Sequence, residues 1–229
     1  MTTASSQARS AARYLQKILT ARVYDVAVES ALEPAKVLSR RLGNNVLLKR
    51  EDLQVVRSYK LRGAYNMMSS LPEEVLKRGV VCASAGNHAQ GFAYSCKKLN
   101  VKGTVFMPSI TPNQKISQTR MHGEGFVEVK LTGDTFDDCA VAAKAYTEAH
   151  QMTFIPPFDD LRIIEGQGTV AVEILEELSD IDYLFLPVGG GGLSAGMGAY
   201  FKTYSPKTTI VGLEPEGAPS MTAALKAGH

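Results

Sequence analysis

The chain has 229 residues, of which 45% are hydrophobic and 21% are charged, with a formal net charge of +2. This is enough apolar sequence to bury a sizeable core in one large domain or two small ones. Basic residues are interleaved with acidic ones rather than clustered, which argues against a nucleic-acid partner.

The cysteines and the N-terminal sequence indicate a compartment. Cys82, Cys96 and Cys139 form no CxxC pair, so neither a disulfide framework nor a zinc site is favoured. Such cysteine usage is typical of a reducing environment. Residues 1–10 are small and polar, unlike a secretory signal, and no run approaches the roughly 20 apolar residues of a membrane helix. We therefore expect a cytoplasmic protein with no membrane partner and no metal.

Helical and strand patterns alternate along the chain. In the first hundred residues the expected elements are helix Ala11–Leu19, helix Ala35–Arg41, strand Val46–Lys49, helix Leu61–Leu71, strand Val80–Ala83 and helix His88–Leu99. The later ones are strand Thr104–Met107, helix Pro112–Met121, strand Phe126–Val129, helix Asp134–His150, helix Thr169–Leu178, strand Tyr183–Val188, helix Gly192–Tyr204, strand Thr209–Leu213 and helix Pro219–Ala227.

This alternation predicts the fold class. Apolar strands separated by helices indicate βαβ units, and hence an α/β protein whose mainly parallel sheets are covered by helices. Ligands of such folds bind beyond the carboxyl ends of the strands. The chain is expected to pass from one α/β lobe to another near Pro156–Pro157.

Four consecutive glycines follow one of the predicted strands. Gly189, Gly190, Gly191 and Gly192 lie between that strand and a helix. Their backbone N–H groups and the helix N-terminus favour a phosphate, whereas a simple turn would need fewer glycines. The loop lacks the lysine of a Walker motif and the third glycine of a dinucleotide fingerprint, so a small phosphorylated cofactor fits better.

Lys60 stands at the start of a predicted helix. The positive end of a helix disfavours a further positive charge, and forming a Schiff base would remove that conflict. A solvent-facing lysine is the commoner interpretation for any one of the 25 basic residues. Arg62, two residues further on, is interpreted as structural or surface.

A third candidate loop, Ser84-Ala85-Gly86-Asn87-His88, follows a predicted strand. Asn87 is able to cap the next helix, and the loop N–H groups are equally able to hold a carboxylate. His88 is interpreted as a packed or hydrogen-bonded histidine rather than a catalytic one.

Other polar groups are weaker candidates. The remaining histidines, His122, His150 and His229, share no metal-like spacing. Asp137-Asp138 is expected in the middle of a helix on a solvated face, and Asp159-Asp160 in a turn. No Ser-His-Asp set follows from the spacing.

Together the three loops resemble the motifs of threonine dehydratase (threonine deaminase), a family of pyridoxal-phosphate (PLP) enzymes. The matches are Ser58 to Ala64 with the PLP-lysine motif, Ser84 to Gly91 with the substrate loop and Gly189 to Leu193 with the phosphate loop. Lys49 to Asp52 and Gly166 to Thr169 match further family motifs. The resemblance runs from about Val23 to the end and implies the tryptophan-synthase-β-like fold (PLP fold type II).

The resemblance implies a role for each matching residue. Lys60 would bind PLP and then act as the base on the substrate α-proton. Asn87 would contact the PLP ring hydroxyl. The phosphate would be held by Gly189, Gly190, Gly191, Gly192 and Leu193. The substrate carboxylate would be surrounded by Ser84, Ala85, Gly86 and His88.

The implied reaction is dehydration and deamination of L-threonine, or L-serine, giving 2-oxobutanoate from threonine, in the first step of isoleucine biosynthesis. Two alternatives stay open within the resemblance: a dehydratase with racemase side activity and an inactive PLP-binding remnant. Related serine racemases carry a proton-donating serine where this chain has Ala85, which favours elimination. A nucleotide-binding module rests on the glycines alone, and cysteine synthase motifs differ.

The family resemblance also implies a domain plan. Residues 1–50 and 157–229 would form a large PLP-binding domain and residues 51–156 a small α/β domain. The chain ends before the family's catalytic domain does, so the partner of the PLP ring nitrogen and the C-terminal regulatory domain would lie beyond His229. Full-length members imply a homodimer or homotetramer acting on a small amino acid.

Overall fold

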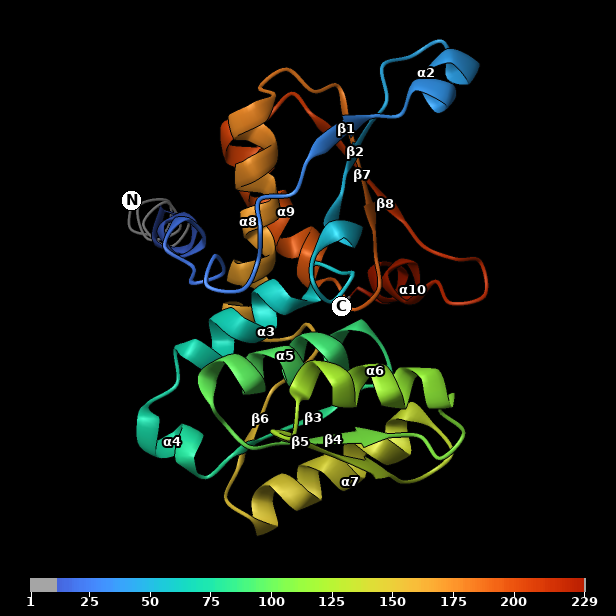
Figure 1. Cartoon of the computed structure of the whole chain (residues 1–229). Coiled ribbons are helices and arrows are strands. Elements are labelled where there is room, and N and C mark those ends of the chain that lie inside the picture. Colours follow the sequence, from blue (N-terminus) through green and yellow to red (C-terminus); the bar gives the residue numbers. More distant parts are fainter. Residues whose placement is uncertain (1–11, 229) are drawn as a thin grey trace.

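The computed structural model describes residues 12–228, which fold into two layered α/β bodies (Figure 1). A helix over residues 12–19 precedes the first strand of the described residues. A short arm follows, built from β1 (Leu32–Pro34), α2 (Lys36–Leu42) and β2 (Leu47–Lys49), with the 3₁₀ turn η1 (Glu51–Leu53) after it. In this arm β1 and β2 pair antiparallel, with Leu32 opposite Lys49.

The first body is built around a four-stranded parallel sheet in the order β5-β4-β3-β6. Its strands are β3 (Val80–Ala83), β4 (Gly103–Met107), β5 (Val127–Leu131) and β6 (Thr153–Phe154). Its helices are α3 (Lys60–Ser69), α4 (Glu73–Lys77), α5 (Asn87–Leu99), α6 (Asn113–Gly123) and α7 (Phe136–Ala149). Figure 1 shows α5 and α6 above the sheet and α7 below it.

Strand periodicity explains these two layers, because successive side chains point to opposite faces of the sheet. Cys82 packs into the cluster that contains Phe92 of α5, whereas its neighbours Val81 and Ala83 pack against Cys139 of α7. Both faces of β3 are therefore buried, which is why it has a continuous apolar sequence.

The second body contains two long helices and a two-stranded parallel sheet. Its elements are α8 (Leu161–Glu177), β7 (Tyr183–Pro187), α9 (Gly192–Tyr204), β8 (Thr209–Leu213) and α10 (Ser220–Ala227). Leu186 of β7 packs with Leu193, Met197 and Phe201 of α9 in one core cluster. The predicted α/β class with parallel sheets is thus confirmed, while the exact domain limits stay a prediction.

Glycines let three helices approach one another closely. A Cβ on Gly166 of α8 would lie 2.7 Å from the Cα of Gly63 in α3, and a Cβ on Gly91 of α5 would lie 2.9 Å from the Leu61 backbone. Backbones this close leave no room for a side chain. The first turn of α3, where Lys60 lies, is therefore fixed between α5 and α8.

Several sequence predictions need correction. The helix predicted from Thr169 begins at Leu161, and the sequence patterns predicted neither β1, η1, α4 nor β6. Asp137 and Asp138 lie in the first turn of α7 rather than mid-helix, because Thr135 is the N-cap and Asp138 completes a capping box with it. Within residues 12–228 we find no helix long and apolar enough to cross a membrane.

Candidate functional site

Lys60 is the first residue of α3 and is partly buried. Its Nζ donates a hydrogen bond to the backbone carbonyl of Pro157 at 2.8 Å, and its backbone N–H donates to Ser58 Oγ at 3.2 Å. Burial lowers the pKa of the Lys60 amine. Across the described part of the chain no carboxylate forms an ion pair with this amine. It is therefore unusually ready to become a neutral nucleophile or base.

The loop from Ser84 to Asn87 joins the carboxyl end of β3 to α5. Ser84 donates its N–H to the Phe106 carbonyl at 3.0 Å, and its Oγ accepts from Gly86 N–H at 3.2 Å. The expected capping role of Asn87 is wrong, because Gly86 is the N-cap and makes no side-chain capping bond. Asn87 is instead the exposed first residue of α5. Its amide is thus available to a ligand at a helix N-terminus.

His88 is buried, as its interpretation as a packed histidine predicted. Its Nε2 lies 3.0 Å from the carbonyl of Ile155, which only accepts, so Nε2 carries the proton. Burial, with a smaller contribution from the Lys60 charge, lowers the pKa of His88 to about 4. At neutral pH this imidazole is therefore uncharged and serves as a donor to the backbone.

The glycine loop leads from β7 into α9 as predicted. Gly191 is the N-cap with φ +85°, and Gly192 begins the helix. A Cβ on Gly190 would lie 2.3 Å from the ring of Phe158, whereas a Cβ on Gly189 would have no heavy atom within 4 Å. The loop therefore packs against Phe158 on one side and is open at Gly189. Its N–H groups and the α9 N-terminus are suited to hold an anion.

The segment Ile155–Phe158 brings these three motifs together. Ile155 accepts from His88, Pro157 accepts from Lys60, and Phe158 packs on the glycine loop. The sequence patterns indicated only a lobe boundary here. No local sequence pattern indicated this role, because the two carbonyls and the Phe158 ring act on partners that are distant in the sequence.

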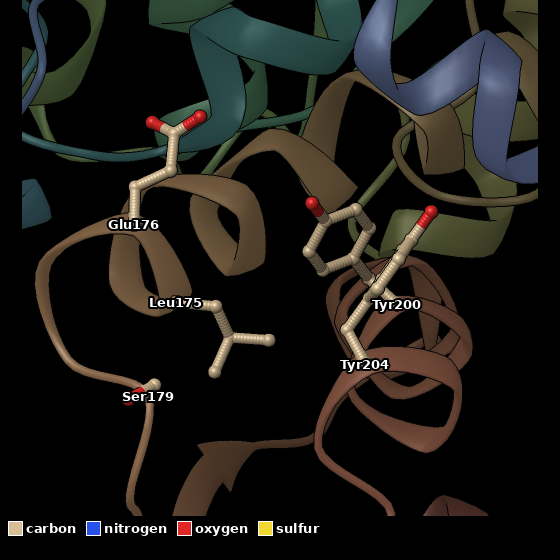
Figure 2. A pocket seen from close by; sticks show the side chains of 5 residues that line it. All are labelled: Leu175, Glu176, Ser179, Tyr200 and Tyr204. Carbon is tan, nitrogen blue, oxygen red and sulfur yellow. The ribbon is translucent and has the colours of Figure 1, made fainter.

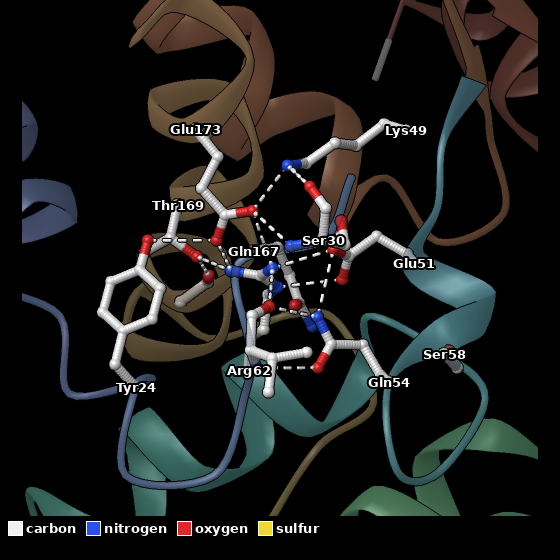
Figure 3. A network of polar contacts seen from close by, with 12 residues as sticks. Tyr24, Ser30, Lys49, Glu51, Gln54, Ser58, Arg62, Gln167, Thr169 and Glu173 are labelled. Atoms are coloured by element: carbon white, nitrogen blue, oxygen red, sulfur yellow. Dashed lines mark hydrogen bonds and ion pairs between the residues drawn. The ribbon is translucent and has the colours of Figure 1, made fainter. Parts of the chain in front are cut away.

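Arg62 belongs to a buried network between α3, α8 and the segment before α3 (Figure 3). Its side chain has 0% exposure and forms ion pairs with Glu51 and Glu173, so of the two predicted possibilities it is structural and not a surface residue. Lys49 pairs with Glu173 at 2.7 Å. The family-like motif from Lys49 to Asp52 thus contributes two residues to the support of α3.

Two cavities lie apart from these loops. One of about 190 Å³ lies between α8 and α9 (Figure 2) and is lined by Leu175, Glu176, Ser179, Tyr200 and Tyr204. One of about 280 Å³ is lined by Glu29, Ser30, Lys49, Glu173, Glu176 and Glu177. Neither includes Lys60, Asn87 or a glycine of the loop. Among residues 12–228 no cluster of three His, Cys, Asp or Glu side chains is arranged to hold a metal ion.

Comparison with known proteins places this arrangement in a family. The profile described as pyridoxal-phosphate dependent enzyme matches residues 25–229. The chain belongs to this family of pyridoxal-phosphate-dependent enzymes. The family resemblance of the sequence motifs and the expected fold type are thereby confirmed.

Individual relatives within this family are L-threonine dehydratases. The chain is 56% identical over 205 residues to the L-threonine dehydratase biosynthetic IlvA of Halalkalibacterium halodurans and 53% identical over 208 residues to that of Bacillus subtilis. These matches cover 89% and 90% of this chain but 49% of each relative. The chain thus spans about half the length of the curated relatives it matches.

Solved structures of threonine deaminase and serine racemase are also similar to this chain. Threonine deaminase isoform 2 from Solanum lycopersicum, in its processed form, superposes with a TM-score of 0.92 at 51% identity, over 96% of this chain and 60% of that one. Serine racemase from Dictyostelium discoideum superposes with a TM-score of 0.85 at 33% identity, over 94% of this chain and 70% of that one. This chain is therefore more similar to the deaminase in both sequence and fold.

Proposed function

We propose that the chain carries the PLP-binding part of an L-threonine dehydratase, with Lys60 as the residue that binds the cofactor. The proposed reaction converts L-threonine, or L-serine, into a 2-oxo acid and ammonia, which for threonine begins isoleucine biosynthesis. The proposal rests mainly on one observation. The partly buried Lys60 amine has a neutral carbonyl as its partner, in a chain that is more than half identical to biosynthetic threonine dehydratases.

The residues present fit PLP in three respects. An aldehyde needs an amine that readily loses its proton, and burial favours this at Lys60. A phosphate needs clustered N–H donors at a helix N-terminus, and Gly189 to Gly192 supply them with an open side at Gly189. The ring needs a polar side chain beside the lysine, and the exposed amide of Asn87 is suited to this. Leu193, buried behind the loop, would fix the glycines in place.

The proposed mechanism assigns chemistry to this chain's own groups. When bound, PLP acts as an electron sink that stabilises negative charge at the substrate Cα. Lys60 Nζ would take the substrate α-proton, and the Pro157 carbonyl would accept a hydrogen bond from the resulting ammonium. The N–H groups from Ser84 to Asn87 at the α5 N-terminus hold the substrate carboxylate. Neutral His88 keeps the Ile155 segment in place without adding charge.

Ala85 favours elimination over racemisation. A racemase needs a second proton donor on the face opposite the lysine, and a methyl side chain has no proton to give. The 33% identical serine racemase therefore supports the fold more than the reaction. A dehydratase with racemase side activity remains the second candidate, carried by that structural similarity alone.

The wider setting is part of the same proposal. We place the site where residues 51–156 meet residues 1–50 and 157–229, because α3 and α8 cross there. Free and buried cysteines suit the cytoplasm. Assembly of the full-length protein as a homodimer or homotetramer is proposed from the family resemblance.

Lys60→Ala tests the central assignment. PLP added to the wild-type chain is expected to give the visible absorbance of lysine-bound cofactor, and borohydride reduction should place the label on the peptide that contains Lys60. The variant should lose both signals. Lys77→Ala, an exposed lysine on α4, is the matched control and should retain them.

Three outcomes separate the candidates. Lysine-bound PLP with 2-oxo acid formed from threonine supports the dehydratase. Lysine-bound PLP without product supports the inactive remnant. Visible absorbance that persists in Lys60→Ala contradicts the assignment of Lys60.

A further inference from the structure

Four buried charged side chains form a cluster at the first turn of α3. Arg62 and Lys49 carry the positive charges, and Glu51 and Glu173 carry the negative ones, so the cluster is formally neutral (Figure 3). The side chains are almost entirely buried, with exposures of 0% for Arg62, 3% for Glu173, 10% for Lys49 and 12% for Glu51. Buried charges are stable only when paired and hydrogen-bonded, so each member depends on the others.

Hydrogen bonds fix the guanidinium of Arg62 from every side. It binds Glu51 through Nε at 2.9 Å and Nη2 at 2.8 Å, and Glu173 through Nη1 at 2.5 Å and Nη2 at 3.1 Å. Thr169 Oγ1 and the Val28 carbonyl accept its remaining bonds. This double fork is specific to arginine, because a lysine ammonium lacks its planar set of donors.

The other members join the cluster to the segment before α3. Lys49 Nζ also donates to the Ser30 carbonyl at 2.5 Å, and Ser30 Oγ donates to Glu51 at 2.7 Å. Tyr24 donates its hydroxyl to Glu173 at 3.0 Å. Burial acts to raise the pKa of Glu173, but the hydrogen bonds and charges of Arg62 and Lys49 outweigh it and lower that pKa. Glu173 therefore stays ionised at neutral pH.

This cluster reaches Lys60 through a single helical turn. Arg62 N–H donates to the Tyr59 carbonyl at 3.0 Å, and Lys60 lies between these two residues. Tyr59 caps α3 without a side-chain hydrogen bond. The position of the first turn therefore depends on the Arg62 side chain and on the close contacts of Gly63 and Leu61 with neighbouring helices.

Few ionisable groups face the Lys60 amine itself. Tyr59 of α3 has its ring centroid 5.6 Å from Nζ, and His88 of α5 interacts with the Lys60 charge. The segment Ile155–Phe158 contributes only backbone carbonyls, and Asp160 beyond it pairs with Arg162. Among the described residues, the neutral cluster is a set of buried charges that joins the first turn of α3 through Arg62.

We propose that the cluster of Arg62, Lys49, Glu51 and Glu173 is a positioning device for Lys60, which fixes the first turn of α3 and keeps the field at the amine free of net charge. This inference rests on the proposed function for its purpose, since the amine must be both placed and readily deprotonated. Its physical content, the coupling of cluster charge to Lys60, holds with or without cofactor.

Breaking the charge balance should shift the Lys60 pKa in a predictable direction. Glu51→Gln leaves one uncompensated positive charge and should lower it. Lys49→Met leaves one negative charge and should raise it. By Coulomb's law, one unit charge acting over about 10 Å at an effective dielectric constant of about 20 shifts a pKa by about one unit, and this is the scale we expect. Loss of structure alone would move both variants the same way, toward an exposed lysine.

Trace acetylation of the cofactor-free chain measures this directly. The protein is labelled with a limiting amount of acetic anhydride across a pH series, and mass spectrometry follows the Lys60 peptide. Glu73→Gln and Lys77→Met make the same charge changes in an exposed ion pair of α4 and should leave the Lys60 profile unchanged. The exposed carboxylates Glu29, Glu176 and Glu177 beside the cluster are the same in every variant.

The double variant Lys49→Met with Glu173→Gln separates charge from structure. It removes a pair and keeps the cluster neutral, so the Lys60 pKa should return to within a few tenths of the wild-type value. It also serves as the test if a single variant does not fold, as judged by circular dichroism.

Shifts of equal sign in Glu51→Gln and Lys49→Met, or a double variant that shifts as far as a single one, would overturn the proposal. Absence of lysine-bound PLP with the acetylation shifts intact would instead count against the proposed function alone.

Discussion

Lys60 is partly buried and His88 is fully buried, and burial lowers the pKa of each. The consequence differs between them. A lysine with a lowered pKa gives up its proton more readily, whereas a histidine with a pKa of about 4 is uncharged at neutral pH and becomes a fixed donor. Desolvation therefore favours the proposed role of Lys60 as a base, and it leaves His88 as a neutral hydrogen-bond donor with no part in proton transfer.

His88 makes stability depend on pH between its two pKa values. The folded chain keeps it neutral down to about pH 4, while the unfolded chain protonates it below about 6.5. The unfolded state binds more protons in this window, so stability falls as the pH falls from 6.5 to 4. The penalty is about 2–3 kcal/mol at pH 4.5. His88→Gln keeps a donor for Ile155 and should lose that much less stability than wild type between pH 7 and 4.5.

Urea unfolding at the two pH values measures the difference. Carboxylates such as Glu173 contribute equally to both proteins and cancel in the comparison. His150→Gln, at an exposed histidine of the α7 C-terminus, controls for removal of an imidazole as such. An acid-induced loss of stability that is as large in His88→Gln as in wild type would show that the buried histidine is not its source.

At the scale of elements, sequence patterns predicted the bounds of some helices and strands but not the start of α8, where it crosses α3. Strand β3, helix α9 and strand β8 have the predicted bounds, because each has a clear apolar periodicity or glycine boundary. The first two turns of α8 were not predicted, since Gly166 and Gly168 lower helix propensity. Tertiary contact overrides that propensity: Gly166 packs on Gly63, and Gly168 packs on Ile18. Only the fold shows this reason for the glycines.

Gly166→Ala tests the close approach of the two helices. Helix propensity alone would make alanine stabilising. The new Cβ would lie 2.7 Å from Gly63 Cα and 2.8 Å from the Arg62 carbonyl, both backbone atoms, so α3 and α8 would have to move apart. We expect a loss of about 1–3 kcal/mol in the free energy of unfolding by denaturant titration. Gly217→Ala, with no atom within 4 Å of its new Cβ, is the control. A Gly166→Ala chain at least as stable as wild type would contradict the crossing.

For the molecule as a whole, the candidate site exists only through long-range contacts. The three motifs could be found in the sequence because each has its own local signature, a lysine at a helix start, a polar loop after a strand and a run of glycines. The segment from Ile155 to Phe158 has no such signature. Its two carbonyls accept from His88 and Lys60, which precede it by roughly seventy and a hundred residues, and its Phe158 ring packs on the glycine loop roughly thirty residues later. The pairing of Arg62 with Glu173 is equally distant in sequence. Such contacts follow from the packing of α3, α5 and α8, which local periodicity does not encode.

The same packing leaves one face of the β7–β8 sheet open. Leu184 and Leu186 pack toward the core formed with α9, whereas Tyr183 and Phe185 alternate to the other face and are 61% and 60% exposed. Across β8, Leu213 is 52% exposed. Contiguous exposed apolar side chains next to unpaired strand edges favour self-association.

Phe185→Lys should therefore reduce self-association of this chain. The substitution places a charge on the open sheet face without removing a buried contact, so the free energy of unfolding should change by less than about 0.5 kcal/mol. Sedimentation velocity over a concentration series should show less association than for wild type. Val141→Lys adds the same charge at a 69% exposed position on α7, in the other body, and should sediment like wild type. Equal effects of the two substitutions would attribute the change to net charge rather than to the sheet face, and an associated Phe185→Lys chain would place the contact elsewhere.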